Sequence, residues 1–529
     1  MGLDIKYKVV EKYTVTAELT QPMHIGSAGG SKGEILIHPV DDVPFIQASG
    51  IAGVFRSYCT KYYSEDIAKK FFGESRVSDK ETSSAGQKKV PENADQGVDS
   101  DVQSRAGSRL KISDGYFLTS GTVADLQAEE KEAGIQSGIG LELRPRVEIN
   151  PATGSAAASR IKGSGKTSGH KFETEYIGAG ALCRFTVYDM SPDVSVGIDN
   201  KSEGRRLMEC IFAAMNSEDI QFGGQKSNGC GYMKVESVKF KRFDLTDRKQ
   251  LRLWINEDSV TDKDMETITV SAQGPSASAY RITVTGKTEN RLLVKAIAVE
   301  NKDGSAPDAR NMQNHAGDYI VPASSFKGAV RARTEKVLKY LETDKRLDVS
   351  DILQDSFGSN MARDTNTLGN LRFFDTIVRD VWEDAGEKQE DEKSDVKSGV
   401  KGEAASDLAR RASVDHKIHI DKFTGGVMNK ALVTENTIGG EITFRINILN
   451  MKSPDKTCAV LLMVLRDLAN GQFNIGSGYA SGKGFIDVHT ITVEAGQEEA
   501  VLDYEDGTVT DEHQIIRRCM DSLKRKEAV

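Results

Sequence analysis

The sequence predicts a mixed α+β protein in which one domain is duplicated in tandem. Four sequence landmarks of the first half recur in the same order in the second half, 253 to 285 residues later. Within each half, segments such as YTVTAELT and YRITVTG alternate apolar and polar residues as strands do, and they accompany segments with helical spacing. We therefore predict a first domain at 1–243, a linker at 244–278, a second domain at 279–495 and an acidic-then-basic tail at 496–529.

The landmarks are short motifs that pair one to one between the halves. PFIQASGIAGVFR pairs with YIVPASSFKGAVR, and FFGES with RLKISDGYF pairs with SFGSN and NLRFFDTIV. VEINPATG pairs with IHIDKFTGG, and FGGQKSNGCGYMKV pairs with IGSGYASGKGFIDV. Each VEINPATG-type motif is followed by a Glu-containing stretch, with Glu175 in the first copy and Glu435 in the second.

The clearest helix is predicted at 324–341. Its apolar residues Phe326, Val330, Val337 and Leu341 have helical spacing, and Ser324 or Ser325 is a candidate N-cap. The first copy repeats the pattern after Ser49, with Ile51, Phe55, Tyr58 and Tyr62 on one face. In the linker, LRLWI could form an additional strand.

Charge is distributed unevenly along the 529 residues. Lys and Arg number 70 against 79 Asp and Glu, a net charge of −9, which taken whole argues against binding of a polyanion. However, 380–407 carries −6 and 494–512 carries −8, so the remaining chain carries +5. Because surface charges act over about 8–10 Å, the net charge does not exclude RNA. The polar insertions 74–108 and 379–407 are predicted to be loops that bury no face.

Cysteine usage and hydropathy give the expected compartment. The six cysteines are scattered with no CxxC spacing, which favours reduced thiols and a cytoplasmic location over a zinc site or a disulfide framework. No apolar run approaches the ~20 residues of a membrane helix, so we expect no membrane partner.

Two segments concentrate basic residues. The segment 144–172 carries a net +5, from Arg144, Arg146, Arg160, Lys162, Lys166 and Lys171 against Glu148. The segment 410–430 carries +3, from Arg410, Arg411, Lys417, Lys422 and Lys430 against Asp415 and Asp421, and it includes the apolar Val427 and Met428. Either segment could be a projecting hairpin that contacts RNA, or a solvated basic loop.

The predicted start of the 324–341 helix is a candidate phosphate site. Ser324, Ser325 and Lys327 would offer hydroxyl groups, backbone N–H groups and an ammonium group, and Arg331 follows one turn later. The alternative is an ordinary capped amphipathic helix. Ser49 and Arg56 are the corresponding candidates in the first copy.

The glycine-rich motifs are not phosphate-binding P-loops, because neither matches G-x-x-x-x-G-K-[ST]. Both precede predicted strands. Lys226 and Lys483 favour close approach to RNA, whereas tight turns that need positive φ explain the glycines equally well.

Together, PASSFKGAVR, LRFFD, IDKFTGG and GSGYASGKG resemble the RAMP superfamily, specifically the backbone subunits of type III CRISPR effector complexes, and the tandem resembles the double backbone proteins of III-D-like systems. The first copy departs from the motifs at Gly50, Ala52 and Asn150. The resemblance implies two ferredoxin-like (RRM-like) domains with inserted β-hairpin thumbs. It also implies binding to a CRISPR guide RNA, a complementary target RNA, neighbouring backbone subunits and a large subunit, with thumbs that cross and kink the guide–target duplex.

The resemblance also implies a cleaving Asp in a loop before the PASS motif. Asp308 lies 14 residues before Pro322 and is the candidate for catalysis and for binding a divalent metal such as Mg²⁺. The alternative is a loop Asp with no role. The first copy has Lys32 and Glu34 in this region but no Asp. For His24, His315, His416 and His419 we expect structural or solvent-exposed roles.

The function predicted from the sequence is a guide-RNA-binding backbone subunit whose second repeat is the candidate for metal-dependent target RNA cleavage. Two alternatives stay open: a guide-RNA-processing endoribonuclease of the same superfamily, and a protein-only scaffold that binds acidic partners.

Overall fold

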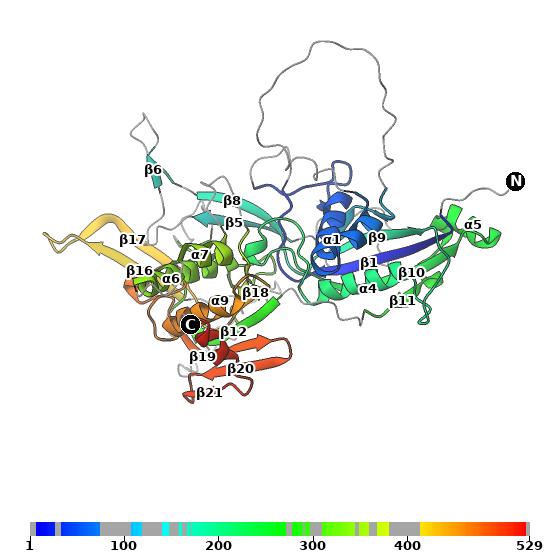
Figure 1. The fold of residues 1–529 in the computed structure, drawn as a ribbon. Coiled ribbons are helices and arrows are strands. Elements are labelled where there is room, and N and C mark those ends of the chain that lie inside the picture. The colour runs from blue at the N-terminus through cyan, green and yellow to red at the C-terminus, as the bar shows by residue number, and fades with distance from the viewer. Residues whose placement is uncertain are drawn as a thin grey trace, which may run out of the picture.

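The protein contains two domains, each built on an antiparallel sheet (Figure 1). The computed structural model describes residues 7–26, 33–74, 107–118, 140–147, 158–160, 167–169, 171–270, 278–288, 291–296, 309–343, 349–358, 368–379 and 413–524. The polar insertions 74–108 and 379–407 therefore lie outside the described residues except at their ends. The predicted duplication of an α+β domain is confirmed.

The first domain has the strand order β11-β10-β1-β9-β4-β2, and β3 also pairs with β9. Tyr13 in β1, Phe55 in α1 and Phe212 in α4 are fully buried in its core, so both helices pack against the sheet. The bounds are β1 Val9–Leu19, β2 Phe45–Ile46, α1 Ala48–Tyr62, α2 Glu65–Phe72, β3 Leu110–Ile112, β4 Gly115–Leu118, β9 Leu182–Ser191, α4 Glu203–Asn216, η1 Lys226–Asn228, β10 Met233–Asp244 and β11 Glu266–Ile268.

The second domain has the strand order β14-β18-β12-β19-β20-β21. Val284 in β12, Phe326 in α6 and Val464 in α9 belong to its core. The bounds are β12 Ser278–Thr288, β13 Ile320–Val321, α6 Ala323–Thr343, α7 Val349–Phe357, β14 Leu371–Phe373, β15 Thr376–Ile377, β18 Glu441–Leu449, α9 Pro454–Ala469, η4 Tyr479–Ser481, β19 Ile486–Ala495, β20 Glu498–Asp503 and β21 Thr508–Thr510.

Both sheets follow the same connectivity. Each domain has four core strands, which in chain order are β1, β3, β9 and β10 in the first domain and β12, β14, β18 and β19 in the second. In both sheets they lie side by side in the order fourth, first, third, second: β10-β1-β9-β3 and β19-β12-β18-β14. The chain order is strand, helix, strand, strand, helix, strand. This arrangement is the ferredoxin-like fold, which confirms the fold that the resemblance implied.

A β-hairpin projects from each domain after its second core strand (Figure 1). Thumb 1 consists of β5 (Leu141–Val147) paired with β8 (Lys171–Ile177), and of β6 (Ala158–Arg160) paired with β7 (Thr167–Gly169). Thumb 2 consists of β16 (Ser413–Ile420) and β17 (Val427–Thr437). The described residues of the two basic segments are thus parts of hairpins.

Two of the predicted domain boundaries are corrected. Residues 244–270 are not a linker, because β11 pairs with β10 and helix α5 (Arg248–Ile255) packs Trp254 against Phe243. The LRLWI segment is therefore helical and forms no strand. Residues 496–524 are not a tail, because β20 extends the second sheet and α10 (Ile515–Asp521) buries Ile515 and Cys519 completely.

The predicted helix at 324–341 is confirmed, although its cap and part of its buried face differ from the prediction. Helix α6 begins at Ala323, so Ser324 and Ser325 lie inside its first turn, and the backbone N–H of Ala323 donates to Asp375 at 2.8 Å. Leu338 is fully buried, whereas Leu341 is only partly buried. Helix α1 starts in the same way, with the N–H of Ala48 donating to Asp114 at 2.6 Å. An Asp from a neighbouring loop caps each helix.

Candidate nucleic-acid interface between the two domains

The two domains meet head to tail, and the glycine-rich turn of the first packs on the edge strand β14 of the second. A Cβ added at Gly229 would lie 2.0 Å from the carbonyl oxygen of Phe373, so only glycine fits at this contact. Tyr232 stacks on Phe374 with ring centroids 5.3 Å apart. These contacts give the two repeats a fixed relative position.

The tight contact at Gly229 can be tested by comparison with Gly482, the corresponding glycine of the second domain. Both residues have left-handed φ, +67° and +72°, but a Cβ at Gly482 meets no described atom within 4 Å. Gly229→Ala is expected to lower the free energy of unfolding by about 1–3 kcal/mol more than Gly482→Ala, because it alone overpacks the interface. The left-handed strain of about 1–2 kcal/mol is common to both variants. Urea denaturation measures the difference, and equal losses would contradict the assigned contact.

Arg144 of thumb 1 links the domains through a buried ion-pair network. Its guanidinium donates to Asp375 of the second domain at 2.5 Å and to Glu142 of its own strand at 2.8 Å. The backbone N–H of His315 also donates to Glu142 at 3.1 Å. Burial disfavours the Glu142 anion, but Arg144 and His315 outweigh this effect and lower its pKa. Arg144, which we predicted to bind RNA, is thus held by two carboxylates at the domain interface.

A group of five basic residues lies beside this network, and we call it the interdomain cationic cluster: Arg146, Lys226, Lys327, Arg331 and Arg372. The ammonium of Lys327 donates to the hydroxyl of Ser227 in the first domain at 2.7 Å. Burial, followed by repulsion from Arg331, Arg146 and Arg372, lowers the pKa of Lys327 to about 8. The positive charges are therefore close enough to destabilise one another.

Arg372 is the most buried member of the cluster, at 5% exposure. It donates to the side chain of Gln221 at 2.7 Å and to the carbonyl oxygens of Gly369 and Leu371. Burial lowers its pKa, and burial followed by repulsion from Arg372 lowers the pKa of Lys226. In the described part of the chain, Lys226, Lys327 and Arg372 form no ion pair with a carboxylate. Buried positive charge without a counter-charge is costly, which favours an anionic ligand at this position.

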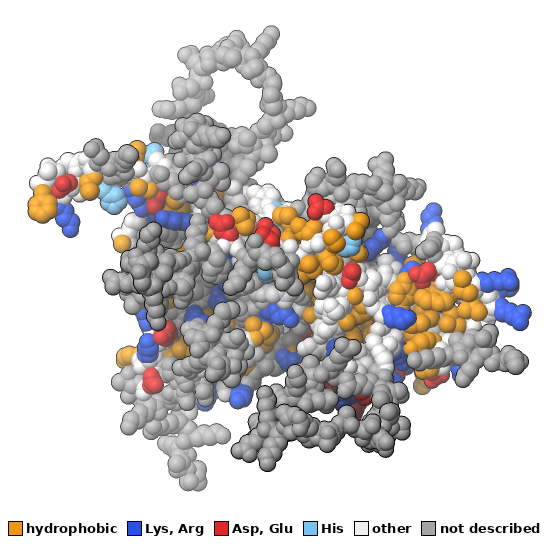
Figure 2. Space-filling model, turned by 90° about the horizontal axis from the view of Figure 1, so that it is seen from above, with side chains coloured by type: hydrophobic (Ala, Val, Ile, Leu, Met, Phe, Trp, Pro, Cys, Tyr) orange, Lys and Arg blue, Asp and Glu red, His pale blue; other side chains and the backbone are white. Residues whose placement is uncertain are grey.

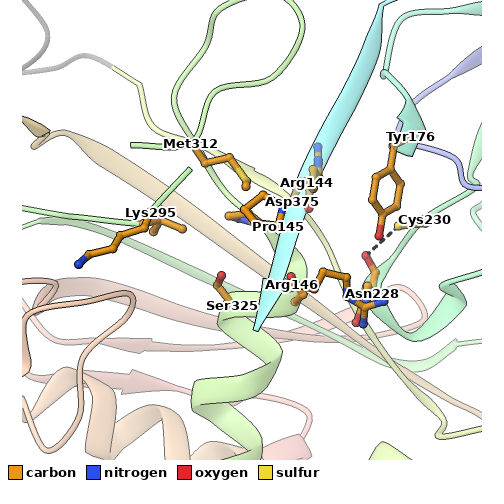
Figure 3. A pocket seen from close by; sticks show the side chains of 13 residues that line it. Arg144, Pro145, Arg146, Tyr176, Asn228, Cys230, Lys295, Met312, Ser325 and Asp375 are labelled. Carbon is orange, nitrogen blue, oxygen red and sulfur yellow. Dashed lines mark hydrogen bonds and ion pairs between the residues drawn. The ribbon is translucent and has the colours of Figure 1, made fainter. Parts of the chain in front are cut away.

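A small, partly open cavity adjoins the cluster and the start of α6 (Figure 3). The first domain lines it with Arg144, Pro145, Arg146, Tyr176, Asn228 and Cys230. The second domain lines it with Val294, Lys295, Met312, Pro322, Ser324, Ser325 and Asp375. Ser324 and Ser325 thus present hydroxyl groups at the N-terminus of a 21-residue helix, where the helix dipole stabilises an anion. This geometry suits a phosphate group.

Other predicted RNA-binding residues lie away from this cavity. Arg56 donates to the carbonyl oxygen of Gly73 at 2.8 Å and lies 3.7 Å from Glu65, so it joins α1 to α2. Lys483 is 5% exposed and contacts Asp415 at 2.8 Å and Glu435 at 2.9 Å. Its charge is therefore balanced within the second domain.

The remaining predicted residues have these places. Ser49 lies at the start of α1, beside an open cavity, and Lys422 is exposed in the turn of thumb 2. Lys171 lies in β8, but its side chain is outside the description, as are Lys166 and Asp308 entirely. His24 contacts the carbonyl oxygen of Glu175 at 2.8 Å, His315 contacts Glu142, and His416 and His419 are exposed.

Thumb 2 exposes apolar side chains along its length. Val427 and Met428, singled out in the sequence, are 61% and 53% exposed, and Phe423 in the turn is 99% exposed. Figure 2 shows hydrophobic side chains next to basic, acidic and His side chains on the projecting hairpin. Phe423 was not predicted, although its position in IDKFTGG, next to the turn glycines, was a usable signal.

Sequence reasoning also missed Arg372 and Asp375. Both lie in the LRFFD landmark, which served only to define the repeat. An Arg between apolar residues of a short strand is a signal of burial with a specific partner. The partner residue, Gln221, is 151 positions away and could not be inferred from spacing.

Two ferredoxin-like domains in tandem, each with a hairpin thumb and with basic residues at their junction, define a class of duplicated RRM-like proteins. The family model of the RAMP superfamily matches residues 16–234 and 285–487. The chain therefore belongs to the RAMP superfamily, with one member domain in each half.

Comparison with solved structures gives a more distant likeness. A chain in the cryo-EM structure of the Type III-B Cmr-beta bound to cognate target RNA is 13% identical, with a TM-score of 0.28. The match covers 44% of this chain and spans 60% of that chain. No curated protein matches the sequence. Among the described helices, none is long and apolar enough to cross a membrane.

Proposed function

We propose that the protein is a guide-RNA-binding backbone subunit of a type III RNA-targeting CRISPR effector complex. The observation that carries the proposal is the interdomain cationic cluster, which lies next to the start of α6 and at the base of thumb 1. A phosphodiester there would supply the counter-charge that the described residues do not give to Lys327 and Arg372. The guide backbone would then run across the junction of the two repeats.

The thumbs support the same proposal. Exposed apolar side chains such as Phe423 and Met428 could insert between base steps, and the neighbouring Lys422 could contact phosphate. In this arrangement the duplex of guide and target RNA is held by the ferredoxin-like core of each domain and interrupted at each thumb. Neighbouring backbone subunits and a large subunit would complete the complex.

We further propose that the second repeat cleaves the target RNA with Asp308 and a divalent metal such as Mg²⁺. Ala309, which follows Asp308 in the chain, is hydrogen-bonded to Thr434 and Asn436 at the base of thumb 2. A carboxylate here would bind the metal or help to activate the attacking 2′-hydroxyl. Among the described residues, no group of three or more His, Cys, Asp or Glu could hold a metal ion.

The RNA-binding proposal is tested by the nucleic acid that remains with the assembled complex after high-salt washing. The expected result is an absorbance ratio typical of a ribonucleoprotein, and sequencing that returns one guide population. An absorbance ratio of bare protein would overturn the proposal and favour the protein-only scaffold. If the isolated chain instead processes guide precursors without added metal, it is the endoribonuclease of the same superfamily.

A further inference from the structure

Gln221 is a buried residue whose side-chain amide contacts both domains at their junction. It is 8% exposed and lies in the first domain between α4 and η1. Its nitrogen donates to the carbonyl oxygens of Lys226 and Cys230, both at 3.0 Å, and its oxygen accepts from Nε of Arg372 at 2.7 Å. Only this orientation of the amide satisfies every partner, because a carbonyl oxygen accepts and a guanidinium donates. Gln221 therefore joins the glycine-rich turn around η1 to an arginine of the second domain.

Two other arginines at the junction are paired with carboxylates. The guanidinium of Arg445 in β18 donates to Glu218 of the first domain at 2.7 Å. The guanidinium of Arg144 donates to Asp375 and to Glu142. The junction thus supplies a counter-charge to both of these arginines.

Arg372, in contrast, has neutral hydrogen-bonding partners throughout the described part of the chain. Besides Gln221, they are the carbonyl oxygens of Gly369 and Leu371, at 2.6 and 3.0 Å. On the neighbouring strand Arg372 lies opposite Asn447, a fully buried residue whose side-chain amide has no hydrogen-bond partner among the described residues. A carboxylate in place of either amide would compensate the charge of Arg372. Gln221 thus holds the guanidinium without neutralising it.

The charge of Arg372 reaches the cationic groups on both sides of the junction. Burial is the largest cause of the lowered pKa of Lys226 and of Lys327, and repulsion from Arg372 lowers the pKa of both further. A positive charge that repels these two ammonium groups also attracts an anion bound beside them. Lys226 and Lys327 belong to different domains, so the position of the glycine-rich turn relative to Arg372 decides whether the three charges act on one anion.

We propose that Gln221 is a positioning residue for an RNA phosphate at the interdomain cationic cluster. It holds the glycine-rich turn of the first domain and Arg372 of the second domain in one arrangement, and as a neutral side chain it leaves the charge of Arg372 available to the phosphate. This inference rests on the proposed function and names a residue that sets the charge of its phosphate site. Neither residue has to contact the RNA, because Arg372 acts through its electric field and Gln221 acts through Arg372 and the turn.

Two substitutions of Gln221 separate its charge from its hydrogen bonds. Gln221→Glu keeps the size of the side chain and places a negative charge beside Arg372. It is expected to weaken the binding of a single-stranded adenosine oligonucleotide about tenfold or more and to reduce the magnitude of the slope of log K against log salt. Gln221→Met removes the hydrogen bonds and adds no charge, so it is expected to lower the melting temperature and to leave this slope unchanged.

Fluorescence anisotropy at several salt concentrations measures the affinity, and circular dichroism checks that each variant folds. Arg372→Gln removes the charge directly and is expected to reduce the slope as Gln221→Glu does. Gln497→Glu adds the same negative charge at an exposed position between β19 and β20 and is expected to match the parent.

The outcomes distinguish this inference from the proposed function. Salt slopes equal to that of the parent for both Gln221→Glu and Arg372→Gln would overturn the inference and leave Gln221 as a packing residue. If Lys327→Met weakens RNA binding whereas Gln221→Glu does not, this inference alone is wrong. If the parent itself does not bind the oligonucleotide, the proposed function is wrong and the inference falls with it.

Discussion

Lys327→Met is expected to weaken the binding of single-stranded RNA by about 10–100-fold and, at pH 7, to raise the melting temperature of the RNA-free protein. A hydrogen bond to a charged group contributes about 1.5–3 kcal/mol, which gives the lower affinity. The higher stability follows because burial and three neighbouring arginines oppose the charge of Lys327 in the folded protein. A gain in stability together with a loss of binding identifies a residue that is retained for its ligand.

Lys336→Met is the matched control, since Lys336 lies on the same helix and is exposed. The control removes the same charge but is expected to leave both quantities close to those of the parent. Fluorescence anisotropy at several salt concentrations measures the affinity. The magnitude of the slope of log K against log salt should decrease by the contribution of about one phosphate contact for Lys327→Met alone. A lower melting temperature with unchanged RNA affinity would mean that Lys327 is only a packing residue.

The pH dependence follows from the lowered pKa of Lys327. In the free protein this group loses its proton near pH 8, about 2.5 units below an unfolded lysine, so the unfolded chain binds more protons between about pH 8 and 10.5. The stability cost is therefore complete below pH 8 and disappears as the pH rises through this window. RNA affinity is expected to fall from pH 7.5 to 9.5 for the parent and to change less for Lys327→Met. An adenosine oligonucleotide is the probe, because its bases do not titrate in this range.

Asp308→Ala is expected to lower target RNA cleavage by the assembled complex about 100-fold or more and to leave guide and target binding unchanged. The proposed carboxylate acts on the reacting groups, and loss of a group that assists proton transfer costs about 10²–10⁴ in rate. Cleavage of labelled complementary RNA with Mg²⁺ measures the effect, and chelation of the metal should abolish the same products.

Glu34→Ala in the first repeat is the control for Asp308. Glu34 lies in the corresponding loop, which has no Asp. The control variant should therefore produce the same cleavage products at the same rate as the parent. If Asp308→Ala cuts every site as fast as the parent, the second repeat does not use this residue.

The sequence predicted the elements that depend on local patterns. The alternation of YRITVTG and the spacing of Phe326 and Val330 were sufficient to predict β12 and α6. The hydrophobic periods of a strand (2 residues) and of a helix (3.6 residues) can be seen within a short stretch of sequence. Helix caps were less accessible. Asp375 caps α6 from 52 positions away, whereas the nearby serines had suggested a local cap.

The boundary errors have a similar cause. LRLWI has the apolar content of a strand, but it forms one amphipathic helix whose Trp254 packs on Phe243 and Tyr188. The acidic segment after position 495 is predominantly polar, yet β20 buries Ala500 against the sheet. Whether such a segment becomes a helix, a strand or a loop depends on a few side chains that are buried in the folded protein. The average composition of the segment does not reveal which side chains these are.

The basic residues show most clearly what folding adds. The sequence by itself was sufficient to predict a duplicated RAMP protein. The motifs recur in the same order in both halves, and their glycines and serines mark turns and helix starts. The sequence also identified Lys226, Lys327 and Arg331 as candidates. Only the tertiary structure brought these residues together with Arg372 and neutralised Arg144 and Lys483 with carboxylates. The reason is that the effect of a charge depends on burial and on partners within a few ångströms, and here the decisive partners lie across the junction of two domains, far apart in the chain.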